Sequence, residues 1–192
     1  MNTRDSSRFV IIAGLMVLAY GCVTPPKWED STGNEYADAE GGYAVTLPSG
    51  WSWIKYNEKS PLLSTRDGPD LQAIRVFFRK HEKAFPAIDQ DSSADMTPRE
   101  LAELFVADLR KERGVGTIDI VDNIPADLGG SPGFRVELAW RSESGLRYRA
   151  VAYGCATARG LYVITYNAPV LHYYEKSIGP FETSVQTFRF LV

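Results

Sequence analysis

The second half of the chain alternates between apolar and polar residues, which is the pattern of a β-strand with one buried face. Residues 134–141 follow this period of two, and the turn-forming segment 142–145 separates them from a second alternating run. With Gly145 in the left-handed conformation at the end of a type I turn, Trp140 lies opposite Tyr148. The apolar side chains of both strands then share one face, whereas a slip of one residue would place Trp140 against an arginine. The pattern therefore predicts an antiparallel hairpin with this register.

Six further strands are predicted by runs that are rich in β-branched and aromatic residues and bounded by turn residues. They cover residues 43–47, 51–56, 61–66, 71–80, 117–124 and 161–167. The fourth of these runs is long and strongly β-forming, so we expect it near the centre of a sheet. The fifth run is expected to end before Pro125.

Helical segments occur at two places. Thr97 and Pro98 begin a segment with apolar residues at helical spacing, and Gly114 ends it. The chain closes with two helical segments, residues 170–178 and 181–188, that Gly179-Pro180 interrupts. This order of elements predicts an α+β fold in which helices flank an antiparallel β-sheet.

The N-terminal segment has the organisation of an export signal. Arg4 and Arg8 precede thirteen uncharged residues, 9–21. This run is shorter than the roughly 20 apolar residues that a membrane-spanning helix needs, and it matches the apolar core of a secretory signal. We therefore expect residues 1–21 to be a signal peptide that is not part of the fold.

Residues 18–22, LAYGC, resemble a bacterial lipobox, with Ala19 where that family prefers leucine. The resemblance implies that Cys22 carries a diacylglycerol thioether and that acyl chains hold the mature protein on a membrane. Val23, rather than aspartate, follows the cysteine, which implies sorting to the outer membrane, facing the periplasm. The alternative is an ordinary secretory cut after Gly21 that leaves Cys22 as a free thiol.

The segment that follows the signal has an unusual composition. Residues 22–42 combine proline, glycine and acidic residues with few aliphatic ones. Such a segment buries too little apolar surface to offset the entropy of ordering it, so we expect a flexible tether after a lipidated Cys22. The remaining residues, 43–192, are enough for a single domain with its own core.

The opening of this domain, GYAVTLPSGW at residues 42–51, resembles the start of PsbP-like domains. Its end, from YNAP at residues 166–169 to FETSVQTF at 181–188, is similar to the last strand and amphipathic helix of the same family. The resemblance implies an α/β/α sandwich and an accessory or assembly role without an active site. It carries no catalytic residue over to this chain.

Composition and charge exclude several classes of protein. The 192 residues include 21 Lys+Arg and 24 Asp+Glu, so the formal net charge is −3. This balance excludes a nucleic-acid-binding polycation, and we expect no nucleic-acid partner. Two cysteines and two histidines are too few for a disulfide scaffold or a histidine-rich metal site. No cofactor motif is present, and a lipidated Cys22 would leave Cys155 without a disulfide partner.

Two patterns could still carry chemistry. Cys155 and His172 could act as nucleophile and base if the fold brings them within hydrogen-bond reach, although a lone cysteine is more often a buried side chain. Residues 89–100 carry oxygen-bearing side chains at positions 1, 3, 5, 7, 9 and 12, the ligand spacing of an EF-hand calcium loop. Ala94 stands where such a loop needs glycine, and the alternative is a solvated acidic loop before a helix. We assign no catalytic residue and no metal ligand from these patterns.

The polar positions of the predicted hairpin give the remaining candidate site. Four arginines and one glutamate are expected on the face opposite Trp140: Arg135, Arg141, Arg147, Arg149 and Glu137. Four guanidinium groups on one face of an acidic protein could bind a carboxylate, a phosphate or a lipid headgroup. The alternative is a solvated or helix-covered face.

These patterns together predict a lipid-anchored envelope protein, a non-enzymatic binding or accessory module whose partner is another envelope protein. One alternative is a carrier of a small anionic ligand on the arginine face. The other is an enzyme that uses Cys155 or a calcium-binding acidic loop.

Overall fold

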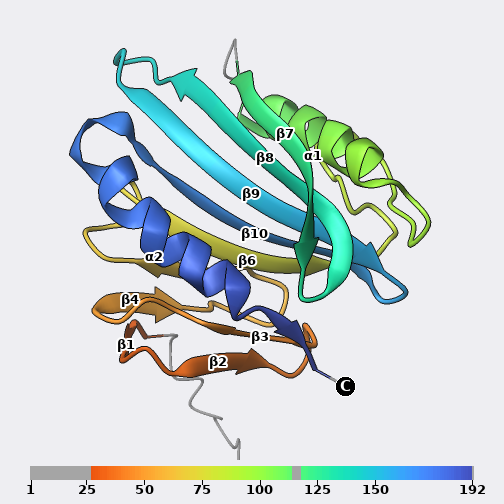
Figure 1. The fold of residues 1–192 in the computed structure, drawn as a ribbon, viewed down its shortest axis with the longest axis horizontal. Helices are drawn as coiled ribbons and strands as arrows, with labels where there is room; N and C mark the ends of the chain where they lie inside the picture. The colour runs from red at the N-terminus through yellow and green to blue at the C-terminus, as the bar shows by residue number, and fades with distance from the viewer. Residues whose placement is uncertain (1–26, 114–117, 192) are drawn as a thin grey trace, which may run out of the picture.

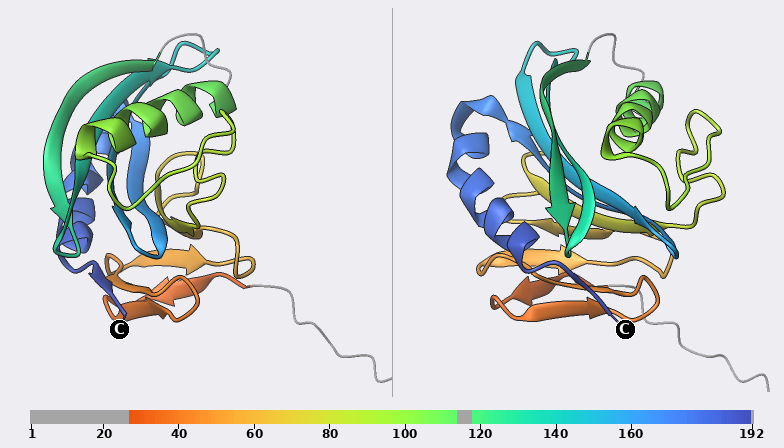
Figure 2. Two further views of the ribbon diagram at one scale, coloured as in Figure 1. Left: turned by 90° about the vertical axis from the view of Figure 1, so that its right-hand side faces the viewer. Right: turned by 45° about the vertical axis from the view of Figure 1, so that its right-hand side comes forward.

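The structure, a computed structural model, describes residues 27–113 and 118–191. The expectations on the signal peptide and on Cys22 lie outside these residues. Within them, an eight-stranded sheet crosses the molecule, and a three-stranded sheet lies beside one of its ends (Figure 1). Two helices lie on opposite faces of the large sheet (Figure 2). The predicted α+β fold, an antiparallel sheet flanked by helices, is confirmed.

The large sheet is antiparallel throughout, in the order β1-β4-β5-β6-β10-β9-β8-β7. Its strands are β1 (Glu29–Ser31), β4 (Trp51–Ile54), β5 (Leu62–Thr65), β6 (Ala73–Arg79), β7 (Ile118–Leu128), β8 (Ser131–Arg141), β9 (Arg147–Thr157) and β10 (Gly160–Pro169). The small sheet consists of β2 (Glu35–Asp38), β3 (Tyr43–Thr46) and β11 (Arg189–Phe190). The helical elements are α1 (Pro98–Arg113), the kinked π-helical turn η1 (Val170–Tyr174) and α2 (Glu175–Gln186).

Each face of the large sheet has its own apolar core. On one face, Leu101 and Phe105 of α1 pack against Phe134 and Leu138 of β8. On the other, aromatic side chains of β10, α2 and the small sheet form the larger core, with Tyr43, Tyr162, Tyr166 and Phe181 at its centre. The sheet is therefore the middle layer of a sandwich, and its two faces can carry different chemistry.

Helix α1 begins where the sequence predicts. The backbone N–H of Thr97 donates to Oε2 of Glu100 at 2.8 Å, and the backbone N–H of Glu100 donates back to Oγ1 of Thr97 at 3.3 Å. This reciprocal pair is a capping box, which satisfies donors that the first turn of a helix leaves unpaired.

The hairpin of β8 and β9 has the predicted register. Trp140 lies opposite Tyr148, and the backbone N–H of Ser142 donates to the carbonyl oxygen of Leu146 at 2.9 Å. Gly145 has a φ of 82°, the left-handed conformation that this turn requires. β6 is also near the centre of the sheet, as its composition predicts.

The prediction of a flexible tether over residues 22–42 is wrong from Glu29 onward, because β1 and β2 lie in that segment. β1 pairs with β4, and β2 pairs with β3. Tyr36 packs edge-on against Trp53, with 4.8 Å between ring centroids, and the buried carboxylate of Asp38 forms an ion pair with Lys55. The aromatic contact, the ion pair and the strand hydrogen bonds thus order this segment although it contains few aliphatic residues.

Two prolines do not end their elements as expected. β7 continues through Pro125 because it is the outermost strand, where a missing N–H leaves no neighbouring strand unpaired. α2 likewise runs through Pro180 as one helix. The irregularity comes earlier, in η1, where His172 has a φ of 75°. None of the helices in the described part of the chain is long and apolar enough to cross a membrane.

Candidate functional site

A hollow beneath α1 results from the small side chains of β9. On the face toward α1, this strand presents Ala150, Ala152, Gly154 and Ala156. The strands on either side carry larger residues on the same face, Leu138 of β8 and Val163 of β10, and Phe77 of β6 lies beyond β10. The result is a cavity of about 440 Å³ between α1 and the sheet, within the size range of small-molecule sites. We call it the α1-side groove.

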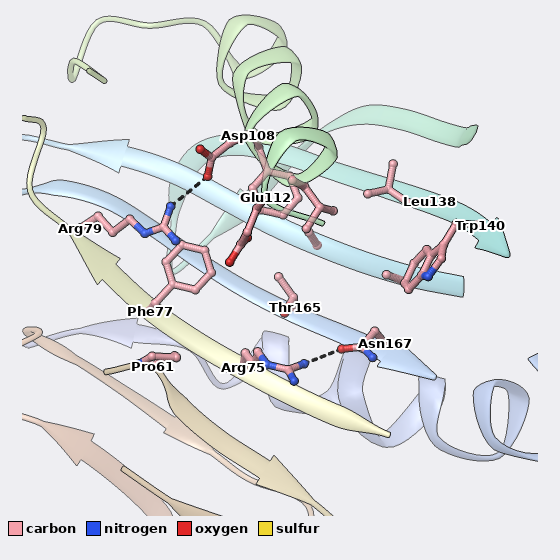
Figure 3. Close-up of a pocket in the computed structure, with 14 residues that line it drawn as sticks. Pro61, Arg75, Phe77, Arg79, Asp108, Glu112, Leu138, Trp140, Thr165 and Asn167 are labelled. Atoms are coloured by element: carbon pink, nitrogen blue, oxygen red, sulfur yellow. Dashed lines mark hydrogen bonds and ion pairs between the residues drawn. The ribbon is translucent and has the colours of Figure 1, made fainter. Parts of the chain in front are cut away.

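The floor of the α1-side groove is polar at the centre of the sheet. Arg75 of β6 and Thr165 of β10 are directly opposite each other in the register. Nη1 of Arg75 donates a hydrogen bond of 2.6 Å to Oδ1 of Asn167 on β10 (Figure 3). All three side chains line the groove and are partly buried. A guanidinium, an amide and a hydroxyl thus share a floor whose other residues are largely apolar.

An ion pair between β6 and α1 fixes the inner end of the groove. Nη1 of Arg79 lies 3.2 Å from Oδ2 of Asp108, a buried residue of α1. Oδ1 of the same carboxylate accepts a hydrogen bond from the backbone N–H of Ala87 at 2.7 Å. The guanidinium of Arg79 also lies over the ring of Phe77, 4.6 Å from its centroid. These contacts hold α1 and the loop before it against the C-terminal end of β6.

Two further features complete the walls. Glu112, on the last turn of α1, is exposed, and its side chain points from the helix into the groove (Figure 3). Trp140 lies at the far end and stacks on Tyr148, with 5.4 Å between centroids and 10° between ring planes. A neighbouring hollow toward the hairpin turn shares Arg75, Trp140 and Asn167 with this one, so the groove is open at that end.

The arginines of the hairpin lie on the opposite face of the sheet, and two of them form ion pairs with acidic residues there, including residues of α2. Arg135 lies 3.5 Å from Glu137, 3.4 Å from Glu182 and 3.6 Å from Asp122. Arg149 forms an ion pair with Glu137 and lies over the ring of Tyr174, 4.9 Å from its centroid.

This network holds α2 against the sheet. The hydroxyl of Tyr153 donates to Glu182 at 2.6 Å; burial, followed by this hydrogen bond, raises the pKa of Tyr153 to about 12. Arg141 and Arg147 are exposed at the hairpin tip. The four predicted arginines are thus divided: Arg135 and Arg149 are held in ion pairs on the α2 side, whereas Arg141 and Arg147 are exposed opposite each other at the tip. Arg141, Arg147 and Arg149 together line a hollow there, so an anion site of these three stays a prediction.

The candidate nucleophile and base are far apart. Cys155 pairs with Tyr162 near one end of β10, whereas His172 follows Pro169 beyond the other end. From Tyr162 to Pro169 the strand rises by seven residue steps, about 23 Å at the usual rise per residue. Burial raises the pKa of the Cys155 thiol to about 12, so the reactive thiolate is disfavoured.

The acidic side chains of residues 89–100 have separate structural partners. Asp91 accepts from the backbone N–H of Lys83 at 2.7 Å, Asp95 accepts from the Ser93 hydroxyl, and Glu100 caps α1. No group of three or more candidate metal-ligating side chains occurs among residues 27–113 and 118–191. The oxygens of the loop thus do not converge on a common point within the described structure.

Sequence reasoning missed the α1-side groove, although two signals for it are present. Thr165 and Asn167 interrupt the apolar positions that Leu161 and Val163 begin on β10. The unbroken series of small residues on one face of β9 is the other signal. Neither could be interpreted without knowing that β6, β9 and β10 are neighbours.

Comparison with known proteins gives the fold. No family model and no curated protein matches the sequence. Among solved structures, cyanobacterial PsbP (CyanoP) from Synechocystis is similar with a TM-score of 0.60 and 14% identity, over 82% of this chain and 91% of that one. The chain has a PsbP/Mog1-like fold.

Two further structures share this fold. The Ran-binding protein Mog1p of Saccharomyces cerevisiae has a TM-score of 0.56 and 12% identity, over 82% of this chain and 95% of its own. LpqN of Mycobacterium tuberculosis, described as involved in cell envelope biogenesis, has a TM-score of 0.52 and 11% identity, over 87% and 92%. At these identities the likeness concerns the fold alone, and the PsbP-like resemblance of the sequence is confirmed at that level.

Proposed function

We propose that this protein is a non-enzymatic binding module of the bacterial envelope, and that the α1-side groove is its binding site. The groove carries the proposal: Arg75, Thr165 and Asn167 form a polar centre on a largely apolar floor, in a cavity of about 440 Å³. A few convergent polar groups in an apolar hollow are the usual composition of a ligand site. The buried thiol and the dispersed acidic loop offer no comparable site for catalysis.

The proposed location is the outer membrane, facing the periplasm, with a lipid on Cys22 as the anchor. It is supported by the lipobox-like LAYGC at residues 18–22 and the export-type residues before it. We expect another envelope protein as partner. The role in cell envelope biogenesis given for LpqN, which shares the fold, is consistent with this expectation.

Two matched variants test the groove as the binding site. Ala152→Leu places a larger side chain in the groove, whereas Ala156→Leu makes the same change on the same face of β9 outside the residues that line it. Circular dichroism and thermal unfolding establish that both variants fold. A third variant, Arg75→Gln, alters the polar floor without filling the space.

The anchored protein is crosslinked and purified from its own membranes, and bound proteins and small molecules are identified by mass spectrometry. We expect a stoichiometric binding partner to copurify with the wild-type and Ala156→Leu proteins. The same partner should be lost with Ala152→Leu and Arg75→Gln. A partner that all four proteins retain, or none with any of them, would overturn the proposal.

A further inference from the structure

The charges of the α1-side groove are sorted between its two walls. Both cations that line it, Arg75 and Arg79, lie on β6, and both anions, Asp108 and Glu112, lie on α1. Arg79 and Asp108 are paired with each other at the inner end, 3.2 Å apart. The open part of the groove is therefore bordered by the carboxylate of Glu112 on the helix side and by the guanidinium of Arg75 on the sheet side (Figure 3).

From this arrangement we infer that the groove takes a dipolar ligand of amino-acid chemistry, with an ammonium group, a carboxylate and an apolar body between or beside them. The inference deepens the proposed function and rests on it. Arg75 can bind a carboxylate through two parallel N–H groups, and Asn167 can donate a further hydrogen bond from its amide nitrogen. Glu112 accepts from the ammonium group.

The apolar body has a matching surface. Ala150, Ala152 and Leu138 form the floor beside the polar centre, and Phe105 and Leu109 of α1 cover it. The ring of Trp140, held by its stack on Tyr148, borders the open end, where an aromatic side chain of the ligand can lie against it.

A ligand with only one charge fits this groove less well. An anion without an amine would lie near Glu112 and Asp108 as well as near Arg75, and a cation without a carboxylate would lie near two arginines. In a site that is partly removed from water, an unfavourable charge of this kind weakens binding substantially. The sorted walls thus favour a ligand whose own charges are separated in the same way. A free amino acid and a short peptide both have this chemistry.

Binding of four probes to the full mature, lipidated protein in detergent tests the inference by calorimetry and by tryptophan fluorescence. The probes are L-phenylalanine, N-acetyl-L-phenylalanine, L-phenylalanine amide and the tripeptide Ala-Ala-Phe. We expect L-phenylalanine or the tripeptide to bind, and the stronger of the two identifies the source as free amino acid or peptide. Removing either terminal charge should weaken binding about tenfold or more.

Variants assign each charge to its side chain. Glu112→Gln should weaken binding of L-phenylalanine about tenfold, but it should not weaken binding of the N-acetylated probe, because that anion loses a repelling carboxylate. Arg75→Gln should likewise weaken binding of L-phenylalanine about tenfold without weakening binding of the amide probe, because that cation loses a repelling guanidinium. Ala156→Leu is the control and should bind like wild type. Equal affinity for charged and blocked probes would overturn the inference, as would no binding of any probe. The proposed function has a separate test, the loss of the crosslinked native partner in Ala152→Leu. If that partner is found and none of the four probes binds, the proposed function stands and the inference fails.

Discussion

Nη1 of Arg75 and Oδ1 of Asn167 lie 2.6 Å apart and join β6 to β10 across the floor of the α1-side groove. Both are side chains of central strands in an eight-stranded sheet, on a face where apolar residues normally pack. A guanidinium placed there needs polar partners, of which Asn167 is one, and it brings a positive charge to the floor of the groove. This pair makes the floor of the groove polar, and the proposed binding site rests on that polarity.

The Arg79–Asp108 pair should matter for stability. We expect Asp108→Ala to lower the free energy of unfolding by about 2–4 kcal/mol, because it leaves Arg79 and the Ala87 N–H without their shared acceptor. Urea denaturation measures the change. The control is Glu103→Ala, which removes an exposed ion pair with Arg99 and should change stability by less than about 0.5 kcal/mol. Similar losses in both variants would show that the pair does not fix α1.

Glu137 should be more important than any exposed hairpin arginine. It is buried and accepts from Arg149 and from the Tyr174 hydroxyl, so Glu137→Ala should destabilise the protein by about 3–5 kcal/mol. Arg147→Ala, at the exposed tip, should change stability by less than about 0.5 kcal/mol. Thermal unfolding distinguishes the two variants, and a larger loss with Arg147→Ala would contradict the network that the structure shows.

Asp38 should contribute to acid sensitivity. Burial alone would raise its pKa, but the hydrogen bonds from Lys55 and from the backbone N–H of Gly41 outweigh burial, and the net pKa lies below the ordinary 3.8. Because the folded-state pKa is the lower one, this carboxylate stabilises the fold above about pH 4 and loses that effect as the pH falls further. We expect unfolding free energies at pH 3 and pH 7 to differ more in wild type than in Asp38→Asn.

Cys155 should be unreactive in the folded protein. A thiol-specific reagent at pH 8 should leave it unmodified for hours, because the side chain is fully buried and its pKa is about 12. The same reagent in concentrated guanidinium chloride should modify it completely. Rapid modification of the folded protein would revive the enzyme alternative.

Replacing Cys22 tests the anchor. Cys22→Ser should move the protein from the membrane fraction to the soluble periplasmic fraction, because the acyl thioether can no longer form. Immunoblots of the two fractions measure the change. A serine variant that still fractionates with membranes would show that the lipobox interpretation is wrong.

Local features of the sequence predicted the elements whose stabilising contacts are near in the chain. Gly145 and the alternation around it were sufficient for the register of the β8–β9 hairpin, and Thr97 with Glu100 for the start of α1. The strands β1 and β2 were missed because their contacts are distant: Asp38 depends on Lys55, and Glu29 pairs with Trp53. Composition over a short window does not contain such contacts.

The candidate site was less predictable than the fold for the same reason. The arginines were placed on the correct face of the hairpin, but the pairing of Arg135 with Glu182 depends on how α2 docks. The α1-side groove needs three strands from distant parts of the sequence and a helix above them. The sequence shows which residues the groove contains, but not that they lie together, because that depends on the order of strands in the sheet.

The most direct measurement of the binding claim is photo-crosslinking in living cells from the edge of the α1-side groove. A photoreactive residue replaces Pro61, which is exposed and lines the groove, or Glu103, which is exposed on α1 away from it. The account predicts a discrete crosslinked product from position 61 that Ala152→Leu abolishes, and no such product from position 103. No product from position 61, or the same product from both positions, would contradict it.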